Sequence, residues 1–245
     1  MAEKARIQEF QERFIAVLGH DLRNPLSSID MGASLLRQRA EQNQDETAAR
    51  VLDRMKASSR RMTRMIGQIL DLTRSRLAGG LEMEPAPVDL CRTITTIVDE
   101  LRTANPTRAI EFHCPKSTVG NWDHDRLAQV FSNLVGNAVS YGPKDRPVQI
   151  DMQEENEEVV TVSVHNEGPP IPQALRTELF SPFRRGARDS KSAETAGLGL
   201  GLYISREIVL AHGGEIDVRS TATDGTTFRV TLPRNAPTQS TKVYV

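Results

Sequence analysis

The sequence predicts an all-α helical hairpin followed by an α+β sandwich, with the two parts meeting near residue 80. Over residues 4–78, apolar side chains recur at every third or fourth position, which is the period of an amphipathic helix. From Asp89 onward, shorter helical stretches are separated by segments in which apolar and polar residues alternate, which is the period of a strand. Helices interleaved with mostly antiparallel strands favour a sheet covered by helices on one face.

The composition is ordinary for a soluble protein: the 245 residues are 38% hydrophobic and 26% charged, enough for two modest domains. A formal net charge of −1 creates no overall attraction toward nucleic acid or anionic membranes. No apolar run approaches the roughly 20 residues that cross a bilayer, and the N-terminus lacks a signal peptide's apolar region. Cys91 and Cys114 have no metal-ligand spacing and indicate no disulfide framework. We therefore expect a cytoplasmic chain with no direct membrane insertion and no nucleic-acid partner.

The first part, residues 1–80, reads as two long helices that break at a polar turn near residues 41–46. Each helix carries a single apolar stripe. The stripe of the first helix comprises Ile7, Phe10, Phe14, Leu18, Pro25, Ile29, Ala33 and Leu36, and that of the second Val51, Met55, Ser58, Met62, Met65, Ile69 and Leu72. Two such helices cannot bury both stripes alone, so we expect a homodimer in which two hairpins form a four-helix bundle.

A histidine stands on the polar side of the first helix. At about 100° per residue, His20 lies roughly 160° from the centre of the apolar stripe, so it is expected to face water. Asn24 follows four residues later on the same face, and Asp21 is adjacent. The run from His20 to Leu26, His-Asp-Leu-Arg-Asn-Pro-Leu, resembles the phosphoacceptor box of sensor histidine kinases. We therefore take His20, Asp21 and Asn24 as candidate catalytic residues.

The second part begins after a predicted linker, residues 81–88, because Gly79 and Gly80 end the helix and two prolines prevent it from resuming. The predicted sandwich spans residues 89–233. Its expected elements are helices at about 89–103, from about 123 and at 199–212, and strands at 109–114, 148–153, 159–165, 215–221 and 226–232. Residues 234–245 read as a polar, disordered tail.

Two asparagines four residues apart, Asn133 and Asn137, aim their amides from one face of a predicted helix. Amide oxygens suit Mg²⁺, which takes few protein ligands alongside phosphate and water. The alternative is a pair of ordinary surface amides. The surrounding residues 125–138 resemble the N box of histidine kinases, and this resemblance implies that both asparagines contact nucleotide and metal.

A glycine-rich turn precedes the helix predicted at 199–212. Glycines at alternate positions let the backbone approach a ligand closely, and the N-terminus of the following helix offers free N–H groups to phosphate. The turn resembles the G2 box of the same family. The candidate nucleotide contacts here are Gly197, Leu198, Gly199, Leu200, Gly201 and Leu202.

Between these motifs, two further segments resemble the G1 and F boxes. The residues that match are Asn166, Gly168, Ile171, Phe180 and Phe183, and Tyr141 is included as a further candidate contact. The sequence departs from the family at three positions. Asn166 replaces the Asp that accepts the adenine amino hydrogen, although an amide oxygen also accepts that bond without the charge. Pro170 replaces a glycine, and Ser140 stands where many relatives carry lysine.

The order of the boxes resembles the catalytic core of a sensor histidine kinase over nearly the whole chain. The resemblance implies an ATP-binding domain of the kind shared with gyrase, Hsp90 and MutL. It also implies MgATP-dependent autophosphorylation of His20, with Asp21 orienting the imidazole or taking its proton. Transfer to an aspartate of a response-regulator receiver domain would follow, with Asn24 positioning water for a phosphatase reaction. The alternatives are a catalytically weak module that binds the regulator and a non-kinase ATPase of the same superfamily.

Overall fold

The computed structural model describes residues 22, 24–77, 81, 83–114, 117–184 and 198–235. Contacts between residues divide the chain into two compact units, with the boundary between residues 79 and 80. The predicted roles of His20, Asp21 and Gly197 concern residues outside the described part of the chain. Among the described residues, no helix is both long enough and apolar enough to span a bilayer.

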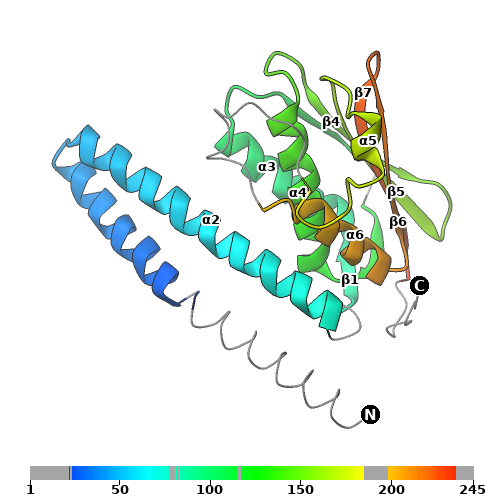
Figure 1. Ribbon diagram of the computed structural model, residues 1–245, viewed down its shortest axis with the longest axis horizontal. Helices are drawn as coiled ribbons and strands as arrows, with labels where there is room; N and C mark the ends of the chain where they lie inside the picture. The colour runs from blue at the N-terminus through cyan, green and yellow to red at the C-terminus, as the bar shows by residue number, and fades with distance from the viewer. Residues whose placement is uncertain are drawn as a thin grey trace, which may run out of the picture. The chain divides into compact units, whose positions relative to one another are not determined.

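The first unit contains a helical hairpin (Figure 1). Residues 24–42 are helical, and after a short turn the chain continues as α2, Glu46–Leu77. Gln44 in the turn takes a positive φ of 54°, and Asp45 starts α2 by accepting a hydrogen bond from the backbone N–H of Ala48 at 2.9 Å. The break predicted at residues 41–46 is therefore confirmed.

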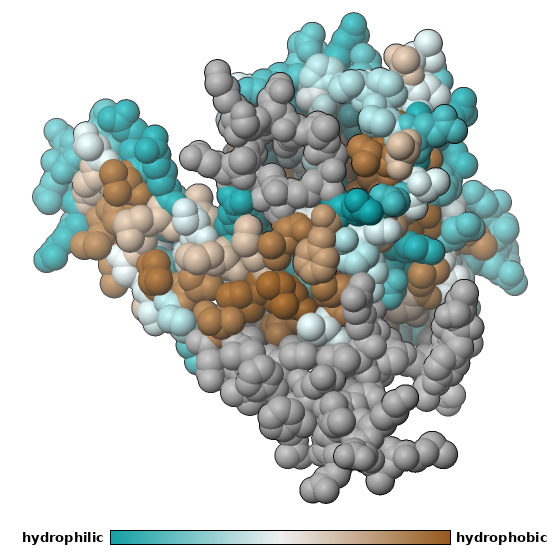
Figure 2. All heavy atoms as spheres, in the orientation of Figure 1, coloured by the Kyte–Doolittle hydropathy of each residue, from teal (hydrophilic) through white to brown (hydrophobic). Residues whose placement is uncertain are grey.

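The hairpin has a narrow core made of Ala33, Ala40 and Leu52, flanked by Ala48 and Ala49. A hydrogen bond of 2.9 Å from the Ser59 hydroxyl to the Leu26 carbonyl also joins the two helices. Large apolar side chains remain exposed along both helices (Figure 2). Those at heptad-like spacing are Leu22, Ile29 and Leu36 on the first helix and Val51, Met55, Met62 and Ile69 on α2.

The second unit is an α+β sandwich. Its elements are β1 (Ala86–Asp89), α3 (Leu90–Ala104), β2 (Ile110–His113), β3 (Val119–Trp122), α4 (His124–Tyr141), β4 (Val148–Glu154), β5 (Val159–Asn166), α5 (Gln173–Arg176), α6 (Gly201–Ala211), β6 (Glu215–Thr221) and β7 (Gly225–Pro233). Five strands form one sheet in the order β2-β4-β5-β7-β6, in which only β2 and β4 run parallel. Helices α3, α4 and α6 cover one face of this sheet (Figure 1).

The core of the sandwich lies between these helices and the sheet. Fully buried side chains come from every layer, including Leu90, Ile94, Trp122, Leu127, Phe131, Leu134, Ile150, Val162, Ile204, Ile208 and Leu232. Asp89 and Asp123 begin α3 and α4 as N-caps, each accepting a hydrogen bond from a backbone N–H three residues later. The helices and strands predicted for this unit are thus present, within a few residues of the expected bounds.

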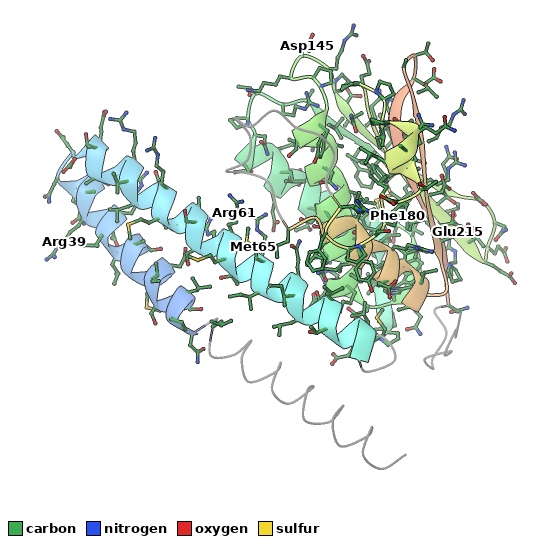
Figure 3. The ribbon with its side chains drawn as sticks, viewed as in Figure 1. Arg39, Arg61, Met65, Asp145, Phe180 and Glu215 are labelled. Carbon is green, nitrogen blue, oxygen red and sulfur yellow. A yellow bond between two sulfur atoms is a disulfide. The ribbon has the colours of Figure 1, made fainter. Side chains whose placement is uncertain are left out.

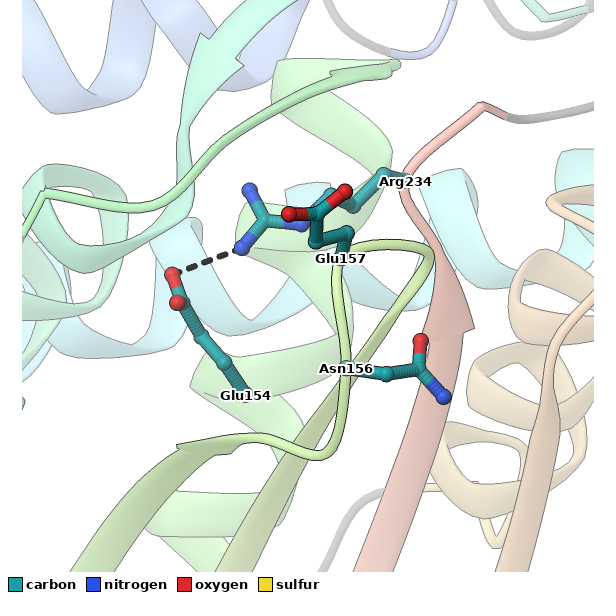
Figure 4. A pocket seen from close by; sticks show the side chains of 4 residues that line it. All are labelled: Glu154, Asn156, Glu157 and Arg234. Carbon is teal, nitrogen blue, oxygen red and sulfur yellow. Dashed lines mark ion pairs between the residues drawn. The ribbon is translucent and has the colours of Figure 1, made fainter.

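Two boundaries differ from the expected ones. Residues 86–88, expected to belong to the linker, form β1 together with Asp89, and β1 pairs antiparallel with β3 at residues 119–122. Arg234, expected in the disordered tail, donates its backbone N–H to Glu158 at 2.7 Å and pairs with Glu154 at 2.6 Å, beside a pocket (Figure 4). Neither segment alternates apolar and polar residues, so the local pattern carried no strand signal.

The expectation about the cysteines was wrong, because Cys91 and Cys114 form a disulfide with their Cα atoms 6.1 Å apart. Their pairing depends on α3 packing against β2, which no local spacing reveals. The bond closes a loop with a sequence separation of 23 residues. In the chain-entropy account, such a loop contributes about 3 kcal/mol of stability by restricting the unfolded chain.

Candidate nucleotide-binding site

Asn133 of α4 reaches the first turn of α6. Its side-chain Nδ2 lies 3.4 Å from the Gly201 carbonyl oxygen and 3.5 Å from the Ser205 hydroxyl. A Cβ atom on Gly201 would lie 3.5 Å from the Asn133 amide carbon and oxygen, so the backbone approaches this amide closely. The structure therefore joins the two segments that resemble the N and G2 boxes. Ser205, which is fully buried, was missed because its helix position carries no motif signal.

A second contact joins the N-terminal end of α4 to the C-terminal end of α6. The backbone N–H of Asp123 donates to Nε2 of His212 at 3.0 Å, and Nδ1 of His212 donates to the Ile208 carbonyl at 2.8 Å. His212 is fully buried, and this burial lowers the pKa of its imidazole below the ordinary value of 6.5. A neutral histidine thus fixes the antiparallel helix pair on which Asn133 and Gly201 stand.

The N-terminus of α6 has no side-chain cap. Leu200 occupies the N-cap position without providing a side-chain hydrogen bond, and α6 begins at Gly201. The N–H groups of the first turn are therefore available to an acceptor, and the helix dipole favours an anion there. The Leu200 side chain is fully buried in the core, so only its backbone can contact a ligand, whereas Leu198 and Leu202 are half-buried.

Gly199 packs against the end of the segment that resembles the F box. It takes a φ of +72°, and a Cβ atom there would lie 2.6 Å from the Arg184 carbonyl oxygen. Phe180, which is labelled in Figure 3, is anchored by an edge-to-face contact with Phe228, with ring centroids 6.5 Å apart. Phe183 has a φ of 63° and is 58% exposed. At position 199, only glycine adopts this positive φ without strain, which explains the residue type there.

A third cluster lies at the end of β5. Asn166 is buried, and its Nδ2 donates to the Glu167 carbonyl at 2.9 Å, which leaves Oδ1 without a hydrogen-bond partner among the described residues. Gly168 takes a φ of +151°, and a Cβ atom there would lie 3.3 Å from the Tyr141 carbonyl oxygen. The backbone N–H of Ile171 donates to the Ser220 hydroxyl at 2.9 Å. The structure thus brings Tyr141, Asn166 and Gly168 together, with one amide oxygen as a free acceptor.

The donor set fits a magnesium ion held partly by a nucleotide. Asn137 is half-buried one turn beyond Asn133, and its amide makes no hydrogen bond within the described residues. Within those residues there is also no group of three or more His, Cys, Asp or Glu side chains that could hold a metal. Any ion would therefore depend on amide and phosphate oxygens, which magnesium accepts.

In the helical hairpin, the structure describes one of the three candidate catalytic residues. Asn24 is exposed, and its carbonyl oxygen accepts a hydrogen bond of 3.1 Å from the Ser28 hydroxyl. Its exposure agrees with the face expected for it. His20 and Asp21 lie outside the described residues, so their roles stay predictions.

Two protein-family models match the chain, one over each unit. Residues 10–78 match the His Kinase A (phospho-acceptor) domain, and residues 122–236 match the histidine kinase-, DNA gyrase B- and HSP90-like ATPases. The chain belongs to the histidine kinase family. The family and the two-part fold predicted from the sequence are therefore confirmed, as is an ATP-binding type of second domain.

Curated relatives of this histidine kinase align along nearly the whole chain. A bacteriophytochrome of Pseudomonas aeruginosa is 40% identical over 96% of the chain, and the adaptive-response sensory kinase SasA of a Synechococcus strain is 32% identical over 94%. The sensor histidine kinase WalK of Bacillus subtilis is 30% identical over 95%. The chain spans 32%, 62% and 38% of these three proteins, respectively.

Solved structures show the same fold. The catalytic domain of the histidine kinase ThkA is 30% identical and covers 62% of this chain and 99% of its own, with a TM-score of 0.53. Full-length ShkA, crystallised with AMPPNP, covers 93% of this chain and 47% of its own, with a TM-score of 0.69. At 24% identity, ShkA supports the fold alone.

Proposed function

We propose that this histidine kinase core uses MgATP to phosphorylate His20 and passes the phosphoryl group to an aspartate of a response-regulator receiver domain. The observation that carries the proposal is the contact of Asn133 with Gly201 and Ser205. Through this contact the Asn133 amide of α4 lies beside an uncapped helix N-terminus, which supports a site where a triphosphate and its metal would meet both.

The nucleotide would lie with its base at Asn166 and its phosphates at α6. The Asn166 Oδ1 accepts a hydrogen bond from the adenine amino group, with Tyr141, Gly168 and Ile171 around the base. The turn from Gly197 to Leu202 donates backbone N–H groups to the phosphates. Asn137 and Asn133 would hold Mg²⁺ through their amide oxygens, and the ion supplies neutralisation of phosphate charge.

His20 acts as the nucleophile. An imidazole with an ordinary pKa of about 6.5 is mostly neutral at pH 7, so a ring nitrogen carries a free electron pair. That nitrogen forms a bond to the γ-phosphorus as the bond from this phosphorus to the ADP oxygen breaks. Asp21 orients the ring or accepts the proton that the imidazole releases. In a separate phosphatase reaction, Asn24 positions water for hydrolysis of the phosphorylated regulator, which releases inorganic phosphate.

The protein partners follow from the hairpin. A second copy of the chain covers the exposed apolar stripes of the two helices and completes a four-helix bundle. The receiver domain docks where it can reach His20. A cytoplasmic location and the lack of a nucleic-acid partner stay predictions from composition.

Radiolabelled ATP tests the proposal. The wild-type protein should acquire a label that is stable in alkali and lost in acid, as expected for phosphohistidine. His20→Gln should abolish the label while leaving nucleotide affinity unchanged, because the acceptor and the ATP site belong to different units. His124→Gln, in α4 at a 58% exposed histidine, is the matched control and should label normally. Nucleotide binding without any label in the wild type would instead support the regulator-binding module.

A further inference from the structure

Arg108 is a buried charge without a partner. It lies between α3 and β2 and is only 8% exposed. All three nitrogens of its guanidinium, Nε, Nη1 and Nη2, are buried, and none has a hydrogen-bond partner in the described part of the chain. Arginine donates five hydrogen bonds and keeps its charge, and buried charges are normally paired. Such an arrangement persists only where something compensates for its cost.

The guanidinium lies beside the proposed base site. Nη2 of Arg108 is 2.5 Å from the point where a Cβ atom would stand on Gly142. The same point is 3.2 Å from the Cβ of Asn166. Sheet register explains this meeting, because Ile110 of β2 pairs with Val148 of β4, and Val148 pairs with Asn166 of β5. Arg108, two residues before Ile110, therefore reaches the end of the sheet at which Asn166 stands.

A purely structural role explains only part of this arrangement. Helix α4 has no basic residue in its last turn, and the Ala138 carbonyl oxygen lies 2.9 Å from the same point near Gly142. A positive charge there is favoured by the helix dipole. A helix-capping arginine, however, would donate hydrogen bonds to the last carbonyls, and Arg108 makes none within the described residues. The dipole accounts for the sign of the charge and leaves the unmade bonds unexplained.

We propose that Arg108 is a specificity-determining residue of the nucleotide site that acts through Asn166 and weakens its preference for adenine over guanine. The inference rests on the proposed function, in which Asn166 meets the base. The two purines differ at position 6, where adenine carries an amino donor and guanine a carbonyl acceptor. A carboxylate at position 166 would accept from the first and repel the second. Here the neutral amide of Asn166 lies beside the unpaired cation of Arg108, so the local electrostatic potential is positive. This potential disfavours the guanine carbonyl much less than a carboxylate at position 166 would.

Arg108 also explains why position 166 carries an amide. The Cβ of residue 166 and Nη2 of Arg108 both lie close to one point, the position that a Cβ atom would take on Gly142. An oxygen carried by a side chain at position 166 therefore extends from a Cβ near the guanidinium. A carboxylate there would be within reach of the guanidinium and would form a buried ion pair. That pair would hold the oxygens away from the base. The amide avoids this capture, because Asn166 instead donates to the Glu167 carbonyl.

A double-mutant cycle on nucleotide selectivity tests the inference. The dissociation constants of ATP and GTP would be measured for the wild type, Arg108→Met, Asn166→Asp and the double variant. Methionine keeps much of the volume and removes a buried charge that has no partner to lose. Arg108→Met should raise the preference for ATP about tenfold. Asn166→Asp should change the preference less than threefold while Arg108 is present, and more than tenfold once Arg108 is methionine.

Stability provides the second readout. Asn166→Asp should raise the melting temperature when Arg108 can pair with it, and lower the melting temperature in the Arg108→Met background. Arg108→Lys, which keeps the charge, should retain the wild-type selectivity even if methionine impairs folding. Arg146→Met is the matched control, because Arg146 is exposed and pairs with Glu167 at 3.5 Å. It should leave the ratio of the two constants unchanged.

The outcomes separate the inference from the function on which it depends. If the wild type binds ATP but Asn166→Asp changes selectivity equally in both backgrounds, Arg108 is only structural and the inference is wrong. A loss of the wild-type ratio in Arg108→Lys would also overturn it. If the wild type binds neither nucleotide, the proposed function fails together with the inference.

Discussion

The two units of this histidine kinase core are each incomplete, but in opposite ways. The helical hairpin has a narrow core of Ala33, Ala40 and Leu52, and large apolar side chains are exposed on both helices, including Leu22, Ile29, Leu36, Val51, Met55, Met62 and Ile69. The ATP-binding unit has a full core with Trp122 and Phe131 completely buried. Among its described residues, the polar groups without a partner include the N–H groups of the first turn of α6, the Asn166 oxygen and the Arg108 guanidinium.

This contrast indicates what each unit needs. Apolar stripes lose free energy to water in proportion to their area, so they are completed by another apolar surface, which a second hairpin offers. Unsatisfied donors and a buried charge gain nothing from such a surface. They are completed by a compact ligand rich in acceptors, as a nucleotide is. The hairpin therefore predicts a protein partner, and the sandwich predicts a charged small molecule.

The largest expected effect would come from placing a charge on the apolar stripe of α2. Met62 is 44% exposed in the single chain and would be buried in the dimer. Met62→Glu puts an unpaired carboxylate into that interface from each copy, at a cost of several kcal/mol, so the dimer dissociation constant should rise at least about 100-fold. Analytical ultracentrifugation measures this constant, and ATP affinity should not change.

Ala57→Glu is the matched control for that substitution. It places the same charge at an exposed position on the same helix, on the opposite side from Met62. The Ala57 variant should remain dimeric. Equal dimerisation of Met62→Glu and wild type would mean that the exposed stripe is not the interface.

A smaller effect is expected from a methyl group at Gly199. In Gly199→Ala, the new Cβ would meet the Arg184 carbonyl oxygen at 2.6 Å, at a φ of +72° that costs an L-residue about 1–2 kcal/mol. The turn must move, so ATP affinity should fall about tenfold while dimerisation is retained. Gly136→Ala in α4 meets nothing within 4 Å and should stabilise the helix slightly. Calorimetric titration that gives one ATP affinity for both variants would remove the Gly199 turn from the site.

The fold was predictable where a local period carried it. The hairpin, α4 and the pair of strands β4 and β5 follow from spacing within single segments. Strand β1 and the Cys91–Cys114 bond were not predictable, because each depends on a partner more than 20 residues away. Arg234 belongs with them, since its contacts with Glu154 and Glu158 form only after β5 and β7 pair.

The same distinction between local pattern and long-range packing applies to the candidate site. The spacing of Asn133 and Asn137 predicted one face of one helix, and the glycine pattern predicted a tight turn before α6. That Asn133 meets Ser205 could not be read from either segment, because it depends on how α4 packs on α6. Arg108 carried no motif at all. It reaches Asn166 only because three strands align in register, which is a property of the sheet.

The smallest expected effect is a pH dependence confined to the ATP-binding unit. His212 is buried as a neutral imidazole whose Nε2 accepts from the Asp123 N–H, and burial lowers its pKa despite the nearby Asp123 carboxylate. Above pH 6.5 the ring is neutral in both folded and unfolded chains, so its contribution to stability is complete. As the pH falls from 6.5 toward the lowered pKa, the unfolded chain binds a proton that the folded chain excludes, and stability is lost.

Trp122, the single tryptophan, is fully buried next to Asp123 and reports unfolding of this unit alone. Urea unfolding followed by its fluorescence should show lower stability at pH 5.5 than at pH 7.5. His212→Gln should lower stability by about 1 kcal/mol at pH 7.5 and reduce the difference between the two pH values. His124→Gln, at an exposed histidine, should retain the full difference, and an equal loss in both variants would assign the pH dependence to other groups.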